Sequence, residues 1–165
     1  MNYNILLVED NSGFRQTLAD TLLARFATMN IAEAGSGEDA LIKVEELRPD
    51  MIFMDINLPG ENGLEATRKI KIRHEHTLIV VLTSYDIPEY RQQAFRNGAD
   101  YFISKSDDAC LVDIFAWVEK AMADKNTQTG QENSNASRWG LFQQRMGITT
   151  VCVPNSGLDP AACLL

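Results

Sequence analysis

The chain has 165 residues, of which 45% are hydrophobic, and it carries a formal net charge of −8 at pH 7. It is long enough for one domain with a buried core, and its acidic balance argues against a general nucleic-acid-binding surface. The apolar runs are too short to span a bilayer, no secretory signal begins the chain, and its cysteines form no metal-binding pattern. We therefore expect a cytoplasmic protein with reduced thiols and no membrane contact.

Short apolar runs that end at polar residues alternate with stretches of helical periodicity. In chain order, the runs predict strands at residues 5–8, 30–34, 51–54, 78–82 and 101–104. The stretches between and after them predict helices at about residues 12–26, 36–48, 64–72, 88–97 and 111–122. This alternation predicts an α/β fold with a parallel sheet and helices on both faces. Ligands of such sheets bind at the edge where the strands end.

Polar side chains stand at the ends of four of these strands. They are Glu9 and Asp10 after the first, Asp55 after the third, Thr83 and Ser84 after the fourth, and Lys105 after the fifth. Parallel strands joined by right-handed crossovers end at the same edge, so we expect these groups to share one small space. Each residue alone fits an ordinary turn or surface position, and it is their joint placement that predicts a site.

Three carboxylates in one small space repel one another unless a cation lies between them. Mg²⁺ prefers oxygen ligands and would draw a phosphoryl group to this acidic edge. Lys105 offers a positive charge and Thr83 a hydroxyl donor to the same anion. Asp55, central in the group, is then a candidate nucleophile that becomes an aspartyl-phosphate.

Four segments carry a resemblance to a known family. They are LLVEDN at 6–11, MDINLPGENG at 54–63, VLTS at 81–84 and GADYFISK at 98–105. In order and spacing they resemble the receiver domain of two-component response regulators, over roughly residues 3–124. The resemblance implies a flavodoxin-like (βα)5 three-layer sandwich, with a five-stranded parallel sheet in the order 2-1-3-4-5.

The resemblance also implies roles for individual residues. Asp55 would be the phosphoacceptor, with Lys105 and Thr83 as its catalytic partners, and Thr83 and Phe102 would form the switch. The implied ligands of Mg²⁺ are Glu9, Asp10, Asp55 and the backbone carbonyl of Asn57. Asn57 and Tyr85 would tune the rate of dephosphorylation.

These roles describe a signalling switch that catalyses its own phosphorylation and dephosphorylation, and they do not describe a conventional enzyme. A sensor histidine kinase or a phosphotransfer protein would supply the phosphoryl group. Residues 88–97, 101–104 and 111–122 would form the output face, through which the protein could also form a homodimer.

The chain departs from the family pattern at two positions. Glu9 precedes Asp10 where many members have two aspartates, a common variant that still offers an oxygen ligand. Ser106 follows Lys105 where many members have proline, which leaves open whether this peptide bond is cis.

Four alternatives stay open. The chain could be the receiver part of a truncated DNA-binding transcription regulator. A haloacid-dehalogenase-like phosphatase would need a second aspartate where Asn57 stands, and a dinucleotide-binding domain would need a GxGxxG motif that is absent after the first strand. A degenerate receiver would act only as a binding module, against which the full set of acids, hydroxyl and lysine argues.

A change of composition divides the chain. We expect a receiver domain over residues 1–124, a polar linker over 125–137 and a tail of unassigned role over 138–165. We expect the tail to be partly disordered or a remnant of cloning. The alternative is a docking segment anchored by Trp139, Leu141 and Phe142.

Overall fold

Five strands and five helices alternate along the chain in the computed structural model, which describes residues 3–106 and 110–128. In order they are β1 (Tyr3–Val8), α1 (Ser12–Arg25), β2 (Met29–Ala34), α2 (Gly37–Leu47), β3 (Met51–Met54), α3 (Gly63–Arg73), β4 (Leu78–Thr83), α4 (Pro88–Arg96), β5 (Tyr101–Ser104) and α5 (Cys110–Gln128). The tail that was predicted as disordered or docking lies outside the described residues.

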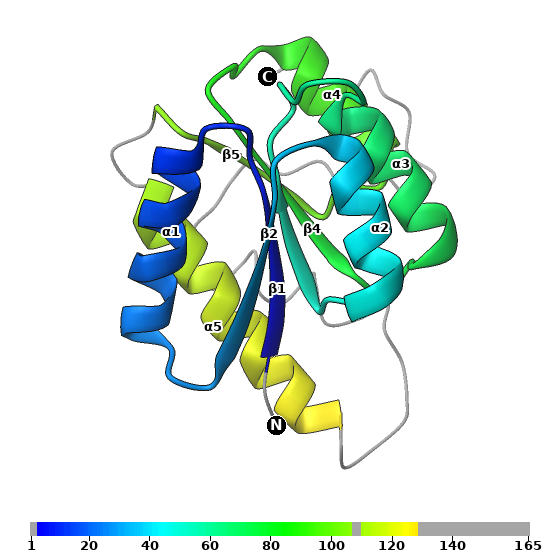
Figure 1. Ribbon diagram of the computed structural model, residues 1–165. Coiled ribbons are helices and arrows are strands. Elements are labelled where there is room, and N and C mark those ends of the chain that lie inside the picture. The colour runs from blue at the N-terminus through cyan, green and yellow to red at the C-terminus, as the bar shows by residue number, and fades with distance from the viewer. Residues whose placement is uncertain (1–2, 107–109, 129–165) are drawn as a thin grey trace, which may run out of the picture. The chain divides into compact units, whose positions relative to one another are not determined.

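The five strands form one parallel sheet in the order β2-β1-β3-β4-β5. Helices α1 and α5 lie on one face of this sheet, and α2, α3 and α4 lie on the other (Figure 1). The flavodoxin-like fold and the strand order are those that the sequence predicted. The order also makes β3 the central strand, so its C-terminal end lies in the middle of the edge where ligands bind.

All four residues of β3 are buried, because the sheet is covered on both faces. Met51 and Phe53 pack into the hydrophobic cluster that includes residues of α1 and α5. Ile52 and Met54 pack into the cluster formed with α2 and α3. Successive side chains of a strand point to opposite faces, so this apolar run anchors β3 from both sides and fixes the position of Asp55 after it.

The helix ends follow local capping chemistry. Asn11 Oδ1 accepts the Phe14 N–H at 3.0 Å before α1, and Ser36 Oγ accepts the Asp39 N–H at 3.2 Å before α2. Asn62 caps α3 in the same way, a cap that was not predicted from the sequence. Helix α4 begins at Pro88, and Gly98 follows its end with φ of +95°, a conformation that glycine adopts without a steric penalty.

Several boundaries differ from the predictions. Strand β1 begins two residues early because Tyr3 pairs with Met29, and Thr83 is the last residue of β4 instead of the residue after it. Helix α5 continues through Gln128, so residues 125–128 of the predicted linker are helical. The sheet belongs to a compact unit that spans Met1–Met122, and a second unit begins at Ala123.

Two further findings concern the backbone and the membrane. Among the described residues no peptide bond is cis, so the bond between Lys105 and Ser106 is trans. A search of the helices in the described ranges found none with the length and apolar character needed to cross a membrane.

Candidate functional site

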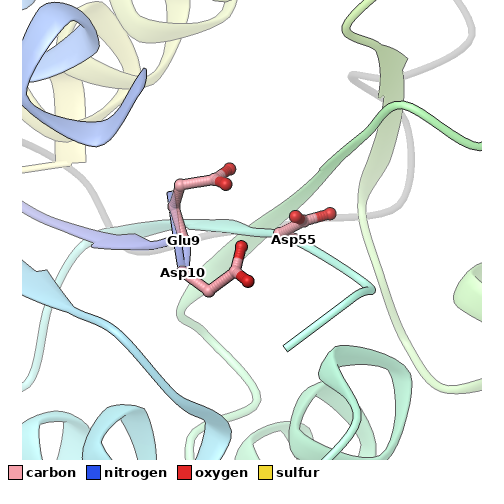
Figure 2. A group of neighbouring side chains, drawn as sticks. All are labelled: Glu9, Asp10 and Asp55. Carbon is pink, nitrogen blue, oxygen red and sulfur yellow. The ribbon is translucent and has the colours of Figure 1, made fainter. Parts of the chain in front are cut away.

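Three carboxylates meet at the C-terminal ends of β1 and β3. The register pairs Val8 with Met54, and the Asp55 N–H donates to the Val8 carbonyl at 2.9 Å, so Glu9 and Asp55 leave adjacent strands side by side. Glu9, Asp10 and Asp55 each offer a carboxylate oxygen within 4.8 Å of the others. Figure 2 shows these three side chains as neighbours at the strand ends. The sheet thus brings together acids that lie 45 positions apart in the sequence.

Lys105 reaches into this acidic group from the end of β5. Its ammonium donates to Asp55 Oδ2 at 3.0 Å and to Glu9 Oε2, and its backbone N–H donates to the Thr83 carbonyl at 2.8 Å. The side chain is only 11% exposed. Lys105 therefore bridges the two buried acids and neutralises part of their mutual repulsion.

The site carries an excess of buried negative charge. Glu9 and Asp55 are each 6% exposed. Burial raises the pKa of the Glu9 carboxyl above its usual value, and Lys105 opposes that rise while the nearby Asp55 charge adds to it. Three carboxylates face one ammonium, so a divalent cation would complete the balance of charge.

Two of the carboxylates have oxygen atoms available to a ligand. Asp55 Oδ1 is buried and accepts no hydrogen bond from any described residue. The exposed Asp10 carboxylate likewise makes no hydrogen bond or ion pair within the described ranges. A buried carboxylate oxygen without a donor is costly, and hard divalent cations take such oxygens as ligands. The residues present therefore fit Mg²⁺.

The loop after Asp55 is held in place by close backbone packing. A Cβ at Gly63 would lie 1.8 Å from the Asp55 carbonyl oxygen, so no larger residue fits there. On the α2 side, Glu38 accepts the Glu61 N–H at 2.9 Å. Asn57, in the same loop, is exposed, and its carbonyl accepts no hydrogen bond from the described part of the chain.

The predicted switch residues lie at the ends of β4 and β5. Thr83 is fully buried, and its hydroxyl accepts the Tyr85 N–H at 3.2 Å. Phe102 is 9% exposed and packs into a cluster with residues such as Ile56 and Ala94. The Arg91 guanidinium of α4 lies 4.6 Å from the centre of its ring. The Phe102 side chain is therefore buried, while that of Tyr85 is exposed.

Two neighbours of the site were not predicted as functional. The Phe14 ring lies with its centroid 4.8 Å from the Lys105 ammonium. Arg15 donates from its guanidinium to the Glu9 carbonyl. Both residues lie on the first turns of α1, and only their position just after the acidic pair hinted at such contacts.

Comparison with known proteins identifies the family of the chain. The family model described as "Response regulator receiver domain" matches residues 5–115. The "Transcriptional activator protein ExaE" of Pseudomonas putida is 32% identical over 155 residues, which cover 87% of this chain and 72% of the relative. The "Transcriptional regulatory protein DegU" of Brevibacillus brevis is 33% identical over 64% of this chain, but over only 44% of its own length.

Solved structures give the same result. The response regulator domain of Thermotoga maritima CheB matches with a TM-score of 0.64 and 28% identity, covering 76% of this chain and 98% of that domain. A CheY-like receiver domain protein from Methanospirillum hungatei JF-1 matches with a TM-score of 0.69, covering 78% and 99% of the two chains. Its 20% identity shows the shared fold alone.

The chain therefore belongs to the response regulator receiver family, as its motifs predicted. It is a receiver domain of two-component signal transduction, a class of signalling switches and not of conventional enzymes. The chain spans about half the length of several of the curated relatives, for example 48% of the "Oxygen regulatory protein NreC" of Staphylococcus haemolyticus.

Proposed function

We propose that Asp55 accepts a phosphoryl group from the phosphohistidine of a sensor histidine kinase or phosphotransfer protein in the cytoplasm. One observation carries this proposal. Asp55 has one oxygen bound to Lys105 at 3.0 Å and the other buried without a hydrogen-bond donor from the described residues, beside two further acids. This arrangement places a candidate nucleophile next to a positive charge and beside a possible cation site.

In the proposed step a carboxylate oxygen of Asp55 attacks the phosphorus atom. A new O–P bond forms, the P–N bond of the phosphohistidine breaks, and the histidine nitrogen leaves with the bonding electron pair. The carboxylate attacks as an anion, so the step needs no base. Lys105 lies where it can pair with the incoming phosphoryl oxygens.

Glu9, Asp10, Asp55 and the Asn57 carbonyl would hold Mg²⁺, which supplies positive charge to the phosphoryl oxygens. Asn57 and Tyr85 are exposed on the loops after β3 and β4. In those positions they would control the access of water to the acyl-phosphate and hence its lifetime.

We infer that the switch begins at Thr83. Its hydroxyl accepts a hydrogen bond from the Tyr85 N–H, so its own proton is free to be donated to a phosphoryl oxygen. A shift of Thr83 toward that oxygen would move the segment that leads into α4. The buried Phe102 ring, covered by Arg91 of α4, would carry the change to the face formed by α4, β5 and α5. That face is the expected output or homodimer surface.

The relatives favour the reading that this receiver acts as part of a transcription regulator. Their printed names are those of a transcriptional activator and transcriptional regulatory proteins. The match to ExaE covers 87% of this chain, more than residues 1–124 alone, so the similarity continues into the C-terminal segment. We therefore propose that phosphorylation of this receiver controls a DNA-binding output.

The proposal is tested by incubating the protein with acetyl phosphate and Mg²⁺ and measuring phosphoryl uptake by intact-mass spectrometry. We expect uptake by the wild type and by Asp20→Asn, an exposed aspartate of α1 that serves as the matched control. Asp55→Asn should take up none. Uptake by Asp55→Asn at the wild-type level would contradict the proposal, and sustained turnover of a small phosphoester would favour the phosphatase alternative.

A further inference from the structure

Arg15 connects three elements behind the acidic group. Its guanidinium donates to the backbone carbonyl of Glu9 at the end of β1, and its Nε donates to Glu33 Oε2 of β2 at 2.8 Å. Only 18% of the Arg15 side chain is exposed. Arg15 itself belongs to the first turns of α1, so one side chain ties α1 to the ends of two strands.

The carbonyl that Arg15 binds belongs to the turn that presents both Glu9 and Asp10. The Glu9 side chain has further partners, Lys105 and the Asn11 N–H at 3.2 Å. The Asp10 carboxylate has none among the described residues. Its direction therefore depends on the backbone of the turn. Arg15 holds this backbone at the Glu9 carbonyl, while the Glu9 N–H donates to the Ala34 carbonyl at 3.0 Å.

Arg15 is itself held in place by a series of polar contacts that begins at Glu33. Its anchor Glu33 also accepts, through its backbone carbonyl, a hydrogen bond from the Lys43 ammonium of α2. Lys43 pairs in turn with Asp39 at 2.8 Å. These contacts thus connect α2 through β2 and α1 to the Glu9 carbonyl at the end of β1.

Two effects of Arg15 on a bound cation oppose each other. Its positive charge would repel the cation, whereas its hydrogen bond would hold the ligand turn in a binding geometry. Glu33 lies against the guanidinium and offsets its charge, so the repulsion is small. Residues that orient ligands without touching the metal typically change metal affinity by about 10- to 100-fold. The positioning effect should therefore dominate.

We propose that Arg15, braced by Glu33, is a positioning residue that sets the Asp10 and Glu9 ligands for the divalent cation. The proposal rests on the function proposed above, because it requires that Mg²⁺ binds at the acidic group. It adds that the contacts of Glu33 in β2 and Lys43 in α2, which support Arg15, contribute to the Mg²⁺ affinity of this site.

Isothermal titration calorimetry with Mg²⁺ tests this on the full chain of wild type, Arg15→Gln and Arg25→Gln. Arg25 is the matched control, since it also lies in α1 and forms an ion pair, with Glu119 at 2.6 Å, away from the acids. We expect Arg15→Gln to weaken Mg²⁺ binding about tenfold. Arg25→Gln, which changes the net charge equally, should stay within about twofold of wild type by the same reasoning.

A second readout separates positioning from general damage to the fold. With acetyl phosphate as donor, Arg15→Gln should raise the Mg²⁺ concentration for half-maximal phosphorylation while leaving the rate at saturating Mg²⁺ close to wild type. Equal weakening in both arginine variants, or an unchanged affinity in folded Arg15→Gln, would overturn the inference.

Glu33→Gln provides the measurement if Arg15→Gln does not fold. It leaves the guanidinium in place but removes the charge of its anchor, and we expect a smaller loss of Mg²⁺ affinity, about threefold. An unchanged affinity there would count against the inference. A wild type that binds no Mg²⁺ would instead contradict the proposed function, so the two failures are distinguishable.

Discussion

The Asp55 carboxyl group lies at a buried position, and its neighbours determine what it can do there. The four residues before it are all buried, and its own side chain is 6% exposed. Lys105 binds one of its oxygens, and the other has no donor among the described residues. A buried carboxylate that is only half satisfied is poorly suited to a structural role, but it is well suited to binding a cation and attacking a phosphoryl group.

Gly63 is the residue that lets the chain pass close to Asp55, and its replacement should be costly. In Gly63→Ala the new Cβ would lie 1.8 Å from the Asp55 carbonyl oxygen, so the backbone must shift. We expect a loss of about 1–3 kcal/mol or more in the free energy of unfolding, measured with urea.

Gly13→Ala is the control for this substitution. Gly13 is also near the start of a helix, but its added Cβ would only touch Asn11 Oδ1 at 3.4 Å. Alanine there should be neutral or stabilising, by up to about 1 kcal/mol. Similar losses in both variants would show that the contact at Gly63 is not what matters.

At the scale of residues, sequence alone predicted which groups gather but not how they touch. The positions of Asp55, Glu9 and Lys105 follow from strand ends, because the sheet topology dictates where those ends lie. The bridge from Lys105 to Glu9 and the Phe14 ring beside Lys105 depend on side-chain rotamers. Rotamers are set by packing between distant elements, which no local pattern in the sequence encodes.

Helices α2 and α3 are joined by a small ionic cluster outside the site. Glu45 of α2 lies 3.3 Å from His74 Nε2 and 3.2 Å from the Arg73 guanidinium. The nearby His74 imidazole, and then the hydrogen bond from the Arg73 guanidinium, hold the pKa of the Glu45 carboxyl below its usual value of 4.5. The ionised form is favoured in the folded state, so its stabilising effect is present above pH 4.5 and is lost as the pH falls through the lowered pKa.

Replacement of His74 should move the titration of Glu45. Because His74 is the largest cause, the pKa of the Glu45 carboxyl in His74→Gln should rise toward 4.5 when followed by carboxyl-carbon NMR. His76→Gln is the control, since His76 contacts Glu75 and not Glu45. An unchanged Glu45 titration in His74→Gln would show that His74 does not set the pKa of this carboxyl group.

At the scale of elements, the predictions succeeded where the hydrophobic pattern is strong. The bounds of β3 and β5 are those predicted, because apolar runs flanked by polar turns leave little freedom. The start of β1 was missed because Asn4 breaks the apolar run, although backbone pairing with β2 extends the strand through it. The end of α5 was missed because polar composition marks exposure and does not by itself end a helix.

The whole molecule should be stabilised by the cation that its acidic edge can hold. A ligand that binds only the folded state adds about 2.7 kcal/mol of stability at 100 times its dissociation constant. We expect the melting temperature of the wild type to rise with Mg²⁺ and to return to its starting value with a chelator. Asp10→Asn should lose this response and Asp20→Asn should keep it. An equal rise in the melting temperature of both variants would show that Mg²⁺ binds at another site.

The family could be predicted for the molecule as a whole because four motifs match it in order and spacing, and that resemblance then implied the strand order. The output could not, since it is set by what the receiver contacts and not by the receiver's own fold. The structure adds one contact of the proposed output face, between the Arg91 guanidinium of α4 and the buried Phe102 ring of β5.

The central claim is that Asp55 is the phosphoacceptor. The most direct test is to treat the Mg²⁺-loaded protein with acetyl phosphate, reduce the acyl-phosphate with borohydride and locate the resulting homoserine by peptide mass spectrometry. We expect homoserine at position 55 and at no other aspartate, and none when Mg²⁺ is chelated. Homoserine at Asp10 or any other aspartate, with Asp55 unmodified, would contradict the account.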